Sequence, residues 1–169
     1  MPRTALAALR SVVGERLLTA PVDLATYAYD GTFLERRPAA VALARTTAEV
    51  AAVVRVCAEH GIPVVARGSG TSLTGGPVPA SGAELVLDLA AMNRIQDIDR
   101  VNMTATVEAG VVTADLGREA ANLGLFYPPD PASLAISTIG GNLACNAGGP
   151  SGLKYGVTRD YVLALEVVL

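Results

Sequence analysis

The sequence has no tryptophan, one histidine and two cysteines among its 169 residues. Aromatic residues make up only 4% of the chain and hydrophobic residues 51%, so we expect a core of Val, Leu, Ile and Ala side chains. Cys57 and Cys145 lie far apart without metal-ligand spacing, which favours a reducing compartment and two thiols that serve as small packing residues. His60 ends a predicted helix, where we expect it to meet terminal carbonyl groups and not to act in catalysis.

A large charge imbalance and a long apolar run are also missing. The 13 Lys and Arg residues stand against 16 Asp and Glu residues without a basic run, which disfavours nucleic-acid binding. No stretch approaches the roughly 20 apolar residues of a membrane span. Arg10, Glu15 and Arg16 interrupt the N-terminus, unlike a signal peptide. These absences predict a soluble, cytoplasmic protein.

Hydrophobic spacing predicts a β-α-β unit in the first half of the chain. A strand over 41–44 is followed by a helix that begins at Thr46, with Glu49 reaching back to complete a capping box. Gly61 suits the left-handed end of this helix, and 62–66 form the next strand. A helical crossover of this kind implies parallel strands.

The remaining elements are predicted from periodicity and turn residues. A helix is expected over 4–18, and a further helix capped by Thr113 and ended by Gly124, with Leu116, Ala120 and Leu123 facing inward. Strands are expected within 84–95, over 104–110 in antiparallel pairing, and over 161–169, while 126–160 are expected to be nearly all loop. The apolar final strand, which lacks a cap, indicates a fragment of a longer chain.

The stretch "VVARGSGTSLTGGPVP" over 64–79 has the composition of a phosphate-binding loop. It fails the dinucleotide fingerprint at Leu73, and Gly76 and Pro77 stand where a P-loop needs Lys and Ser or Thr. What remains is a strand that leads into backbone N–H groups unobstructed by side chains, which is typical of an anion-binding nest. Hydroxyl donors are added by Ser69, Thr71, Ser72 and Thr74. The alternative is a surface turn.

A second glycine-rich stretch, "TIGGNLACNAGG", covers 138–149. Its glycine pairs allow a flat ligand or a pyrophosphate to approach the backbone. Asn142 and Asn146 can both donate and accept, as the edges of heterocycles require. Two such loops in one domain indicate one large ligand between them.

The other polar residues predict no catalytic site. No Ser-His-Asp set stands out, and the G-x-S-x-G motif is absent. Asp130 and Asp160 are expected to form turns. Lys154 and Arg159 either meet phosphate, carry solvated charges or serve as ion-pair partners.

In this order, the motifs resemble the PCMH-type FAD-binding domain of the vanillyl-alcohol-oxidase flavoproteins. The likeness is strongest to the branch that contains the glycolate oxidase FAD subunit and the D-lactate and D-2-hydroxyglutarate dehydrogenases. It covers roughly 25–169 and rests on "PVVARGSGTSLTGGPVP" and on "YPPDPASLAISTIGGNLACNAGGPSGLKYGVTRDYVLALEVVL". The resemblance implies a C-terminally truncated α+β fold after a helical segment, 1–24. Two α/β subdomains follow, about 38–100 and 101–169, one with a parallel β-α-β unit and one with a mixed or antiparallel sheet.

The resemblance also implies the ligand and its contacts. The first loop would wrap the FAD pyrophosphate through main-chain N–H groups, and the second region would line the flavin and its ribityl chain in the crevice between the subdomains. Thr71 stands near the position of the histidine in members with covalent flavin, which implies noncovalent FAD. The implied cofactor-binding residues are Arg67, Gly68, Ser69, Gly70, Thr71, Ser72, Leu73, Thr74, Gly75, Gly76, Pro129, Asp130, Pro131, Ser133, Thr138, Ile139, Gly140, Gly141, Asn142, Asn146, Ala147, Gly148, Gly149, Tyr155 and Gly156.

The activity implied by the resemblance is oxidation of a small 2-hydroxy acid such as glycolate or D-lactate, with hydride passing to flavin N5. An iron–sulfur subunit or a quinone would accept the electrons, which would allow peripheral attachment to the inner membrane. No catalytic residue or metal ligand can be named in this chain. The alternatives are an ether-lipid synthase built on the same FAD scaffold and a flavin-binding module without catalysis. Nucleotide hydrolysis is disfavoured by the missing P-loop lysine.

Overall fold

A computed structural model describes all residues 1–169, and the chain forms two compact units. Unit 1 comprises Met1–Ala91 with Val167–Leu169, and unit 2 comprises Met92–Glu166. The elements of unit 1 are α1 (Arg3–Val13), η1 (Gly14–Arg16), β1 (Leu17–Leu18), α2 (Pro21–Ala25), β2 (Ala40–Leu43), α3 (Thr47–Glu59), β3 (Val64–Arg67) and β4 (Leu85–Asp88).

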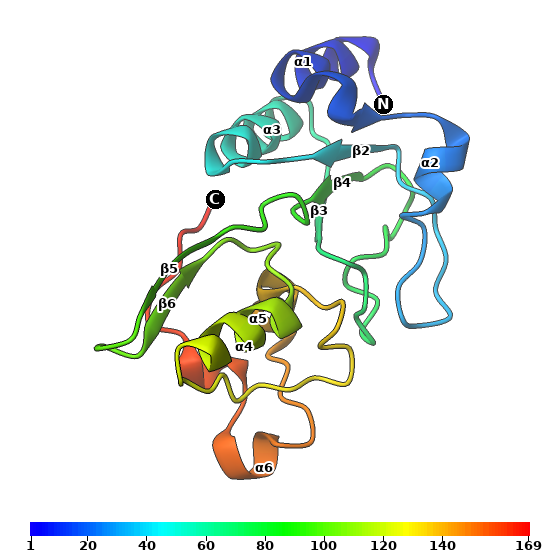
Figure 1. The fold of residues 1–169 in the computed structure, drawn as a ribbon. Helices are drawn as coiled ribbons and strands as arrows, with labels where there is room; N and C mark the ends of the chain where they lie inside the picture. Colours follow the sequence, from blue (N-terminus) through cyan, green and yellow to red (C-terminus); the bar gives the residue numbers. More distant parts are fainter. The chain divides into compact units, whose positions relative to one another are not determined.

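The sheet of unit 1 has the strand order β1-β2-β4-β3 (Figure 1). Strands β2 and β3 both pair in parallel with β4, while β1 runs antiparallel along β2. The predicted parallel β-α-β unit is therefore confirmed. The later strand β4 lies between its two strands.

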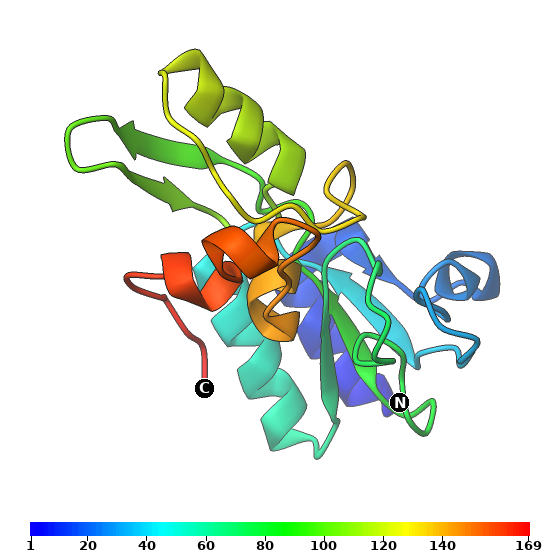
Figure 2. The ribbon, with the colours of Figure 1, turned by 90° about the horizontal axis from the view of Figure 1, so that it is seen from below.

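Strands β2 and β4 are buried on both faces of this sheet, which explains their continuous apolar sequences. Ala40 and Ala42 of β2 point to one face and pack with α1 and α3, which lie side by side (Figures 1 and 2). Val41 points to the other face, where it packs with Val86 of β4 and Leu24 of α2. Successive side chains of a strand alternate between faces, so each four-residue strand contributes side chains to the hydrophobic cluster on either face of the sheet.

The capping box of α3 is only half formed. The Thr46 hydroxyl accepts from the Glu49 N–H at 3.2 Å, as predicted. The Glu49 carboxylate does not return to Thr46, because it is held by the Arg16 guanidinium through two hydrogen bonds of 2.7 and 2.6 Å and by the Arg45 N–H. The guanidinium provides two parallel charge-assisted bonds, whereas the Thr46 N–H would provide only one hydrogen bond from an uncharged donor.

The end of α3 has the predicted structure. His60 Nδ1 lies 2.9 Å from the carbonyl oxygen of Val56, and Gly61 adopts a φ of +64°. The only histidine therefore has a structural partner at the helix end.

Unit 2 is built on the antiparallel hairpin of β5 (Ile95–Asp99) and β6 (Thr104–Val107). Its core contains Val111, Leu116 and Ile139, with Ile95 and Ile98 of β5 packed against them. The sequence predicted a single strand within 84–95 and did not predict β5 as a separate strand. The remaining elements of unit 2 are α4 (Thr113–Asn122), α5 (Ile139–Cys145), α6 (Gly152–Tyr155) and η2 (Thr158–Tyr161).

Two expectations about the chain ends were wrong. The first helix stops at Val13 and not at residue 18, because Gly14 turns away with a φ of +61° and Leu17–Leu18 join the sheet. Residues 162–169 form no strand. Leu163 and Leu169 of this segment are exposed.

Expectations about unit 2 also need correction. The predicted long loop over 126–160 contains α5, α6 and η2. Thr113 is the first residue of α4 and makes no cap, since its hydroxyl is buried against Ser137. Leu123 and Cys145 are exposed and contribute no core packing.

No helix is long and apolar enough to cross a membrane. No group of three or more His, Cys, Asp or Glu side chains could hold a metal ion.

A testable feature of unit 1 is the turn before β4, which is held by a buried carboxylate. Burial of Glu84 opposes its ionisation, but hydrogen bonds from the N–H and hydroxyl of Ser81 and from the N–H of Gly82 lower its pKa to about 2. Glu84→Gln should cost about 1–3 kcal/mol of unfolding free energy at pH 7. Glu59→Gln, on an exposed side chain, is the matched control.

Because the folded-state pKa is lowered, this stabilisation is present above the ordinary value of 4.5 and is lost as pH falls towards 2. Denaturant unfolding at several pH values should show the difference between wild type and Glu84→Gln shrinking over that range. A difference that is the same at pH 3 and pH 7 would contradict the assignment.

Candidate functional site

The loop after β3 presents four consecutive backbone N–H groups without an acceptor in the chain. They belong to Gly68, Ser69, Gly70 and Thr71, and no hydrogen bond of these groups occurs within the protein. Gly70 has a φ of +73°, and successive N–H groups around a left-handed residue form an anion-binding nest. All four residues retain solvent exposure, so a ligand can reach the donors.

The second half of the same loop is bonded to the protein. The Gly75 N–H donates to Asp30 Oδ2 at 3.0 Å, and the Thr74 N–H donates to the Ser72 hydroxyl at 3.1 Å. Gly75 has a φ of +76°, and a Cβ there would lie 2.6 Å from Leu34 Cδ1. The predicted loop therefore divides into an open part, 68–71, and a braced part, 72–76, in which the N–H groups of Thr74 and Gly75 are bonded while that of Gly76 has no acceptor in the chain.

The Arg67 side chain lies beneath the open part of the loop. It is only 7% exposed, and its Nη1 donates to the carbonyl oxygen of Tyr29 at 2.7 Å. A Cβ at Gly70 would lie 2.1 Å from Arg67 Nη2, so only glycine allows the backbone to cross the guanidinium so closely. The cation adds positive charge under the four donors.

The segment Tyr27–Thr32, which we call the strap, supports this loop and was missed in the sequence. Its Gly31 N–H donates to the Ser72 carbonyl at 2.9 Å. The Tyr27 hydroxyl donates to Asp88 Oδ2 at 2.9 Å, and burial, together with the Asp88 charge, raises the pKa of Tyr27. The only available sequence signal was an Asp-Gly pair, which suggests a turn but not its partner.

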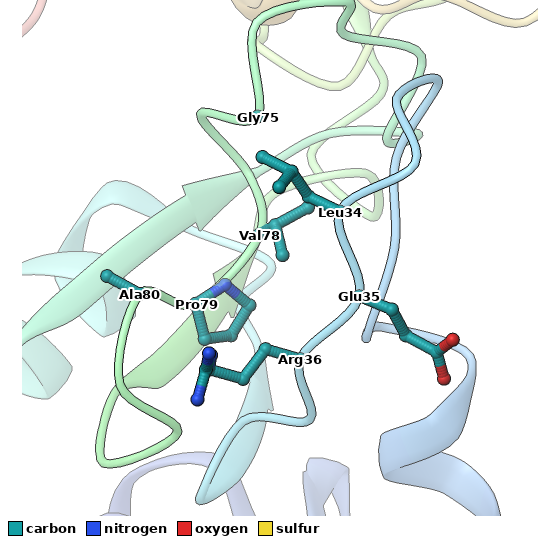
Figure 3. A pocket seen from close by; sticks show the side chains of 7 residues that line it. All are labelled: Leu34, Glu35, Arg36, Gly75, Val78, Pro79 and Ala80. Carbon is teal, nitrogen blue, oxygen red and sulfur yellow. The ribbon is translucent and has the colours of Figure 1, made fainter.

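A small cavity of about 230 Å³ lies beside Gly75 (Figure 3). This volume is below the roughly 300–1,000 Å³ of usual ligand sites, so the cavity takes at most part of a large ligand. Its lining residues are Leu34, Glu35, Arg36, Gly75, Val78, Pro79 and Ala80.

In unit 2, the first turn of α5 is satisfied by the protein itself. The N–H groups of Ile139 and Gly140 donate to the carbonyl groups of Val111 and Ala109, both at 2.8 Å. The Gly141 N–H donates to the Thr138 hydroxyl at 3.2 Å. Unlike residues 68–71, this glycine pair therefore offers few free donors to an anion.

The two asparagines of this stretch have partners within unit 2. Asn142 is buried, and its Nδ2 donates to the Thr113 hydroxyl at 2.7 Å. Asn146 ends α5 with a φ of +50°, and its Oδ1 accepts from the Arg159 N–H at 3.0 Å. Both side chains hold the second loop in shape.

Of the two loop aspartates, Asp160 has the predicted turn-forming role at the start of η2, whereas Asp130 binds a residue 21 positions along the chain. Asp130 accepts from the N–H and the hydroxyl of Ser151 at 3.0 and 2.7 Å, and Asp160 accepts from the Val157 N–H at 2.8 Å. A Cβ at Gly149 would lie 2.0 Å from the Asp130 carbonyl oxygen, so only glycine allows the two backbone segments to approach this closely.

The remaining predicted site residues also lie in unit 2. Tyr155 stacks edge-on against Phe126 at 5.6 Å, and the Lys154 ammonium lies 4.6 Å above its ring. The structure thus gathers the first predicted loop in unit 1 and the second region in unit 2. The other residues of the second region are Pro129, Pro131, Ser133, Ala147, Gly148 and Gly156.

Both a family model and individual relatives match this chain. The family described as "FAD binding domain" matches residues 38–169. The chain is 54% identical over 144 residues to the glycolate oxidase subunit GlcD of Bacillus subtilis, covering 85% of this chain and 30% of the relative. It is 46% identical over 133 residues to a D-lactate dehydrogenase of Anaerostipes hadrus, covering 79% and 28%.

Among solved structures, an alkyldihydroxyacetonephosphate synthase matches with a TM-score of 0.85 and 22% identity, covering 95% of this chain and 32% of the synthase. At this identity, the likeness shows the fold. The chain spans about a third or less of each of these three proteins.

A pair of glycine substitutions tests whether the second loop is shaped by packing. A Cβ at Gly140 would lie 2.8 Å from the Ala109 Cβ and 2.9 Å from its carbonyl oxygen, whereas a Cβ at Gly117 of α4 meets nothing within 4 Å. Gly140→Ala should therefore destabilise the protein by about 1–3 kcal/mol. Gly117→Ala should stabilise it by up to about 1 kcal/mol through helix propensity.

Denaturant unfolding of both variants provides the measurement. Equal stabilisation by the two substitutions would show that Gly140 is not required by its contact with Ala109.

Proposed function

Starting from the chain's membership of the FAD binding domain family, which its match over residues 38–169 establishes, we propose that it is the FAD-binding portion of a flavin-dependent oxidoreductase that acts on a small 2-hydroxy acid. Two of its relatives are a glycolate oxidase subunit and a D-lactate dehydrogenase. Both names describe oxidation of a carbon that bears a hydroxyl next to a carboxylate. That chemistry supports the proposed substrate class.

The observation that carries this proposal is the open row of N–H groups over 68–71. A diphosphate needs several donors at once and no obstructing side chain, and this row supplies four donors above the Arg67 guanidinium. Backbone donors at the carboxyl end of a parallel strand are a common means of binding phosphate in α/β folds. The residues present therefore fit the diphosphate of FAD.

In this account, Gly68–Thr71 would hold the diphosphate, and the second region of unit 2 would line the flavin. When bound, the flavin supplies the redox chemistry by accepting hydride, while the protein supplies binding, orientation and electrostatics. No histidine lies in the first loop, since the only one caps α3. We therefore propose noncovalent attachment.

Two further proposals concern the whole protein. Electrons would leave through an iron–sulfur subunit or a quinone, and residues outside the two loops would act on the substrate. The ether-lipid synthase alternative is supported by fold likeness alone, because the solved synthase is 22% identical to this chain. A flavin-binding module without catalysis would have the same loop and the same bound cofactor.

The experiment that tests FAD binding is a visible absorption spectrum of the purified protein. Flavin bands that acid precipitation releases into the supernatant are expected. Flavin that stays with the precipitate would contradict noncovalent attachment, and a colourless protein that also fails to bind added FAD would contradict the function.

A substitution at Gly76 tests the loop without disturbing the fold. A Cβ there meets only the Thr74 hydroxyl oxygen at 3.5 Å, an ordinary contact, whereas Gly75 is constrained by its positive φ. Gly76→Val should leave the unfolding midpoint close to that of the wild type and abolish flavin retention, because a branched side chain would obstruct approach to the backbone. Gly117→Ala is the control that should retain flavin. Undiminished flavin content in folded Gly76→Val would argue against the proposal that this loop binds FAD.

A further inference from the structure

We propose that the strap Tyr27–Thr32 is part of the FAD site and that Asp30 is its principal positioning residue, an inference that rests on the proposed function. The strap lies before residue 38, where the family match begins. Its role is to hold the first glycine loop in the shape that leaves residues 68–71 open.

The strap is fastened to the loop and to the strands beneath it. Gly31 binds the Ser72 carbonyl, and Tyr29 accepts from Arg67. A Cβ at Gly31 would lie 2.8 Å from the Ser72 carbonyl oxygen, so the two backbones touch. Tyr27 reaches Asp88, which is paired in register with Arg67 across β4 and β3.

Asp30 is the central attachment between strap and loop. Its side chain is among the buried polar groups, with 8% of the residue exposed. Oδ1 accepts from the N–H and the hydroxyl of Thr32 at 2.8 and 2.5 Å, and Oδ2 accepts from the Gly75 N–H at 3.0 Å. No other side chain accepts a hydrogen bond from the Gly75 N–H.

The two parts of the loop therefore have different roles: the braced part anchors the loop, and the open part presents the free N–H groups. By taking the Gly75 N–H, Asp30 fixes the left-handed turn at Gly75 and anchors the braced part, 72–76. The open part then has both ends held, by the strap at Ser72 and by β3 at Arg67. Donors that are already oriented bind an anion without the cost of ordering them.

A carboxylate close to an anion site would weaken binding if its charge were free. Here both oxygens of Asp30 face donors, and the Arg67 guanidinium is bonded to the adjacent residue, Tyr29. The negative charge of Asp30 is therefore stabilised by hydrogen-bond donors of the protein itself.

The test is Asp30→Asn, in which an amide can present an acceptor to Thr32 or to Gly75 but not to both. Glu35→Gln is the matched control. It makes the same charge change close to the strap, and Glu35 points away from Gly75 with an exposed side chain that makes no hydrogen bond (Figure 3). Gly31→Ala is a second test, because its Cβ would push against Ser72 without altering any charge.

Two readouts separate this inference from the proposed function. Hydrogen–deuterium exchange of the apoprotein should be faster over 68–76 in Asp30→Asn and unchanged in Glu35→Gln. Titration with FAD, followed by quenching of flavin fluorescence, should give a dissociation constant raised about 10- to 100-fold in Asp30→Asn, as expected for a lost charge-assisted hydrogen bond. Gly31→Ala should weaken binding in the same direction.

Wild-type exchange and wild-type FAD affinity in Asp30→Asn would overturn the inference while leaving FAD binding intact. A wild-type protein that does not bind FAD would overturn the proposed function, and the exchange measurement would still decide whether Asp30 orders the loop. Faster exchange with unchanged affinity would overturn the positioning role.

Discussion

Two glycine-rich stretches of similar composition differ in the hydrogen bonding of their backbone N–H groups. A backbone donor withdrawn from water must find a partner. In the second stretch, Ile139, Gly140 and Gly141 find theirs in the preceding chain. In the first, residues 68–71 find none. Glycine content alone does not distinguish a packed helix start from a loop whose N–H groups have no acceptor in the chain.

The position of the open stretch follows from the sheet. Strand β3 runs parallel to β4 and ends at Arg67, so its carboxyl end delivers the loop at the edge where α/β folds commonly bind ligands. The same edge holds Asp88, to which the strap is tied through Tyr27. Local sequence thus makes the loop open, while contacts from residues far away along the chain set its shape.

Much of the fold could be predicted, because it is encoded locally. The β-α-β unit, the Thr46 cap and the left-handed Gly61 depend on neighbouring residues and are confirmed. The predicted role of Glu49 in the capping box was wrong because its partner, Arg16, lies 33 residues away in the sequence. The helix α5 was interpreted as loop because Gly140 and Gly141 lower helix propensity, although Thr138 and the contacts to Ala109 and Val111 stabilise its start. The role of Asp30 was also missed, since a contact with Gly75 leaves no periodic or motif signal.

The most direct measurement of the central claim is the amide spectrum of the ¹⁵N-labelled protein, recorded without FAD and with saturating FAD. The account predicts downfield proton shifts for the amides of Gly68, Ser69, Gly70 and Thr71, because each donor gains an anionic acceptor. Unchanged resonances for all four amides in the FAD-saturated protein would contradict it.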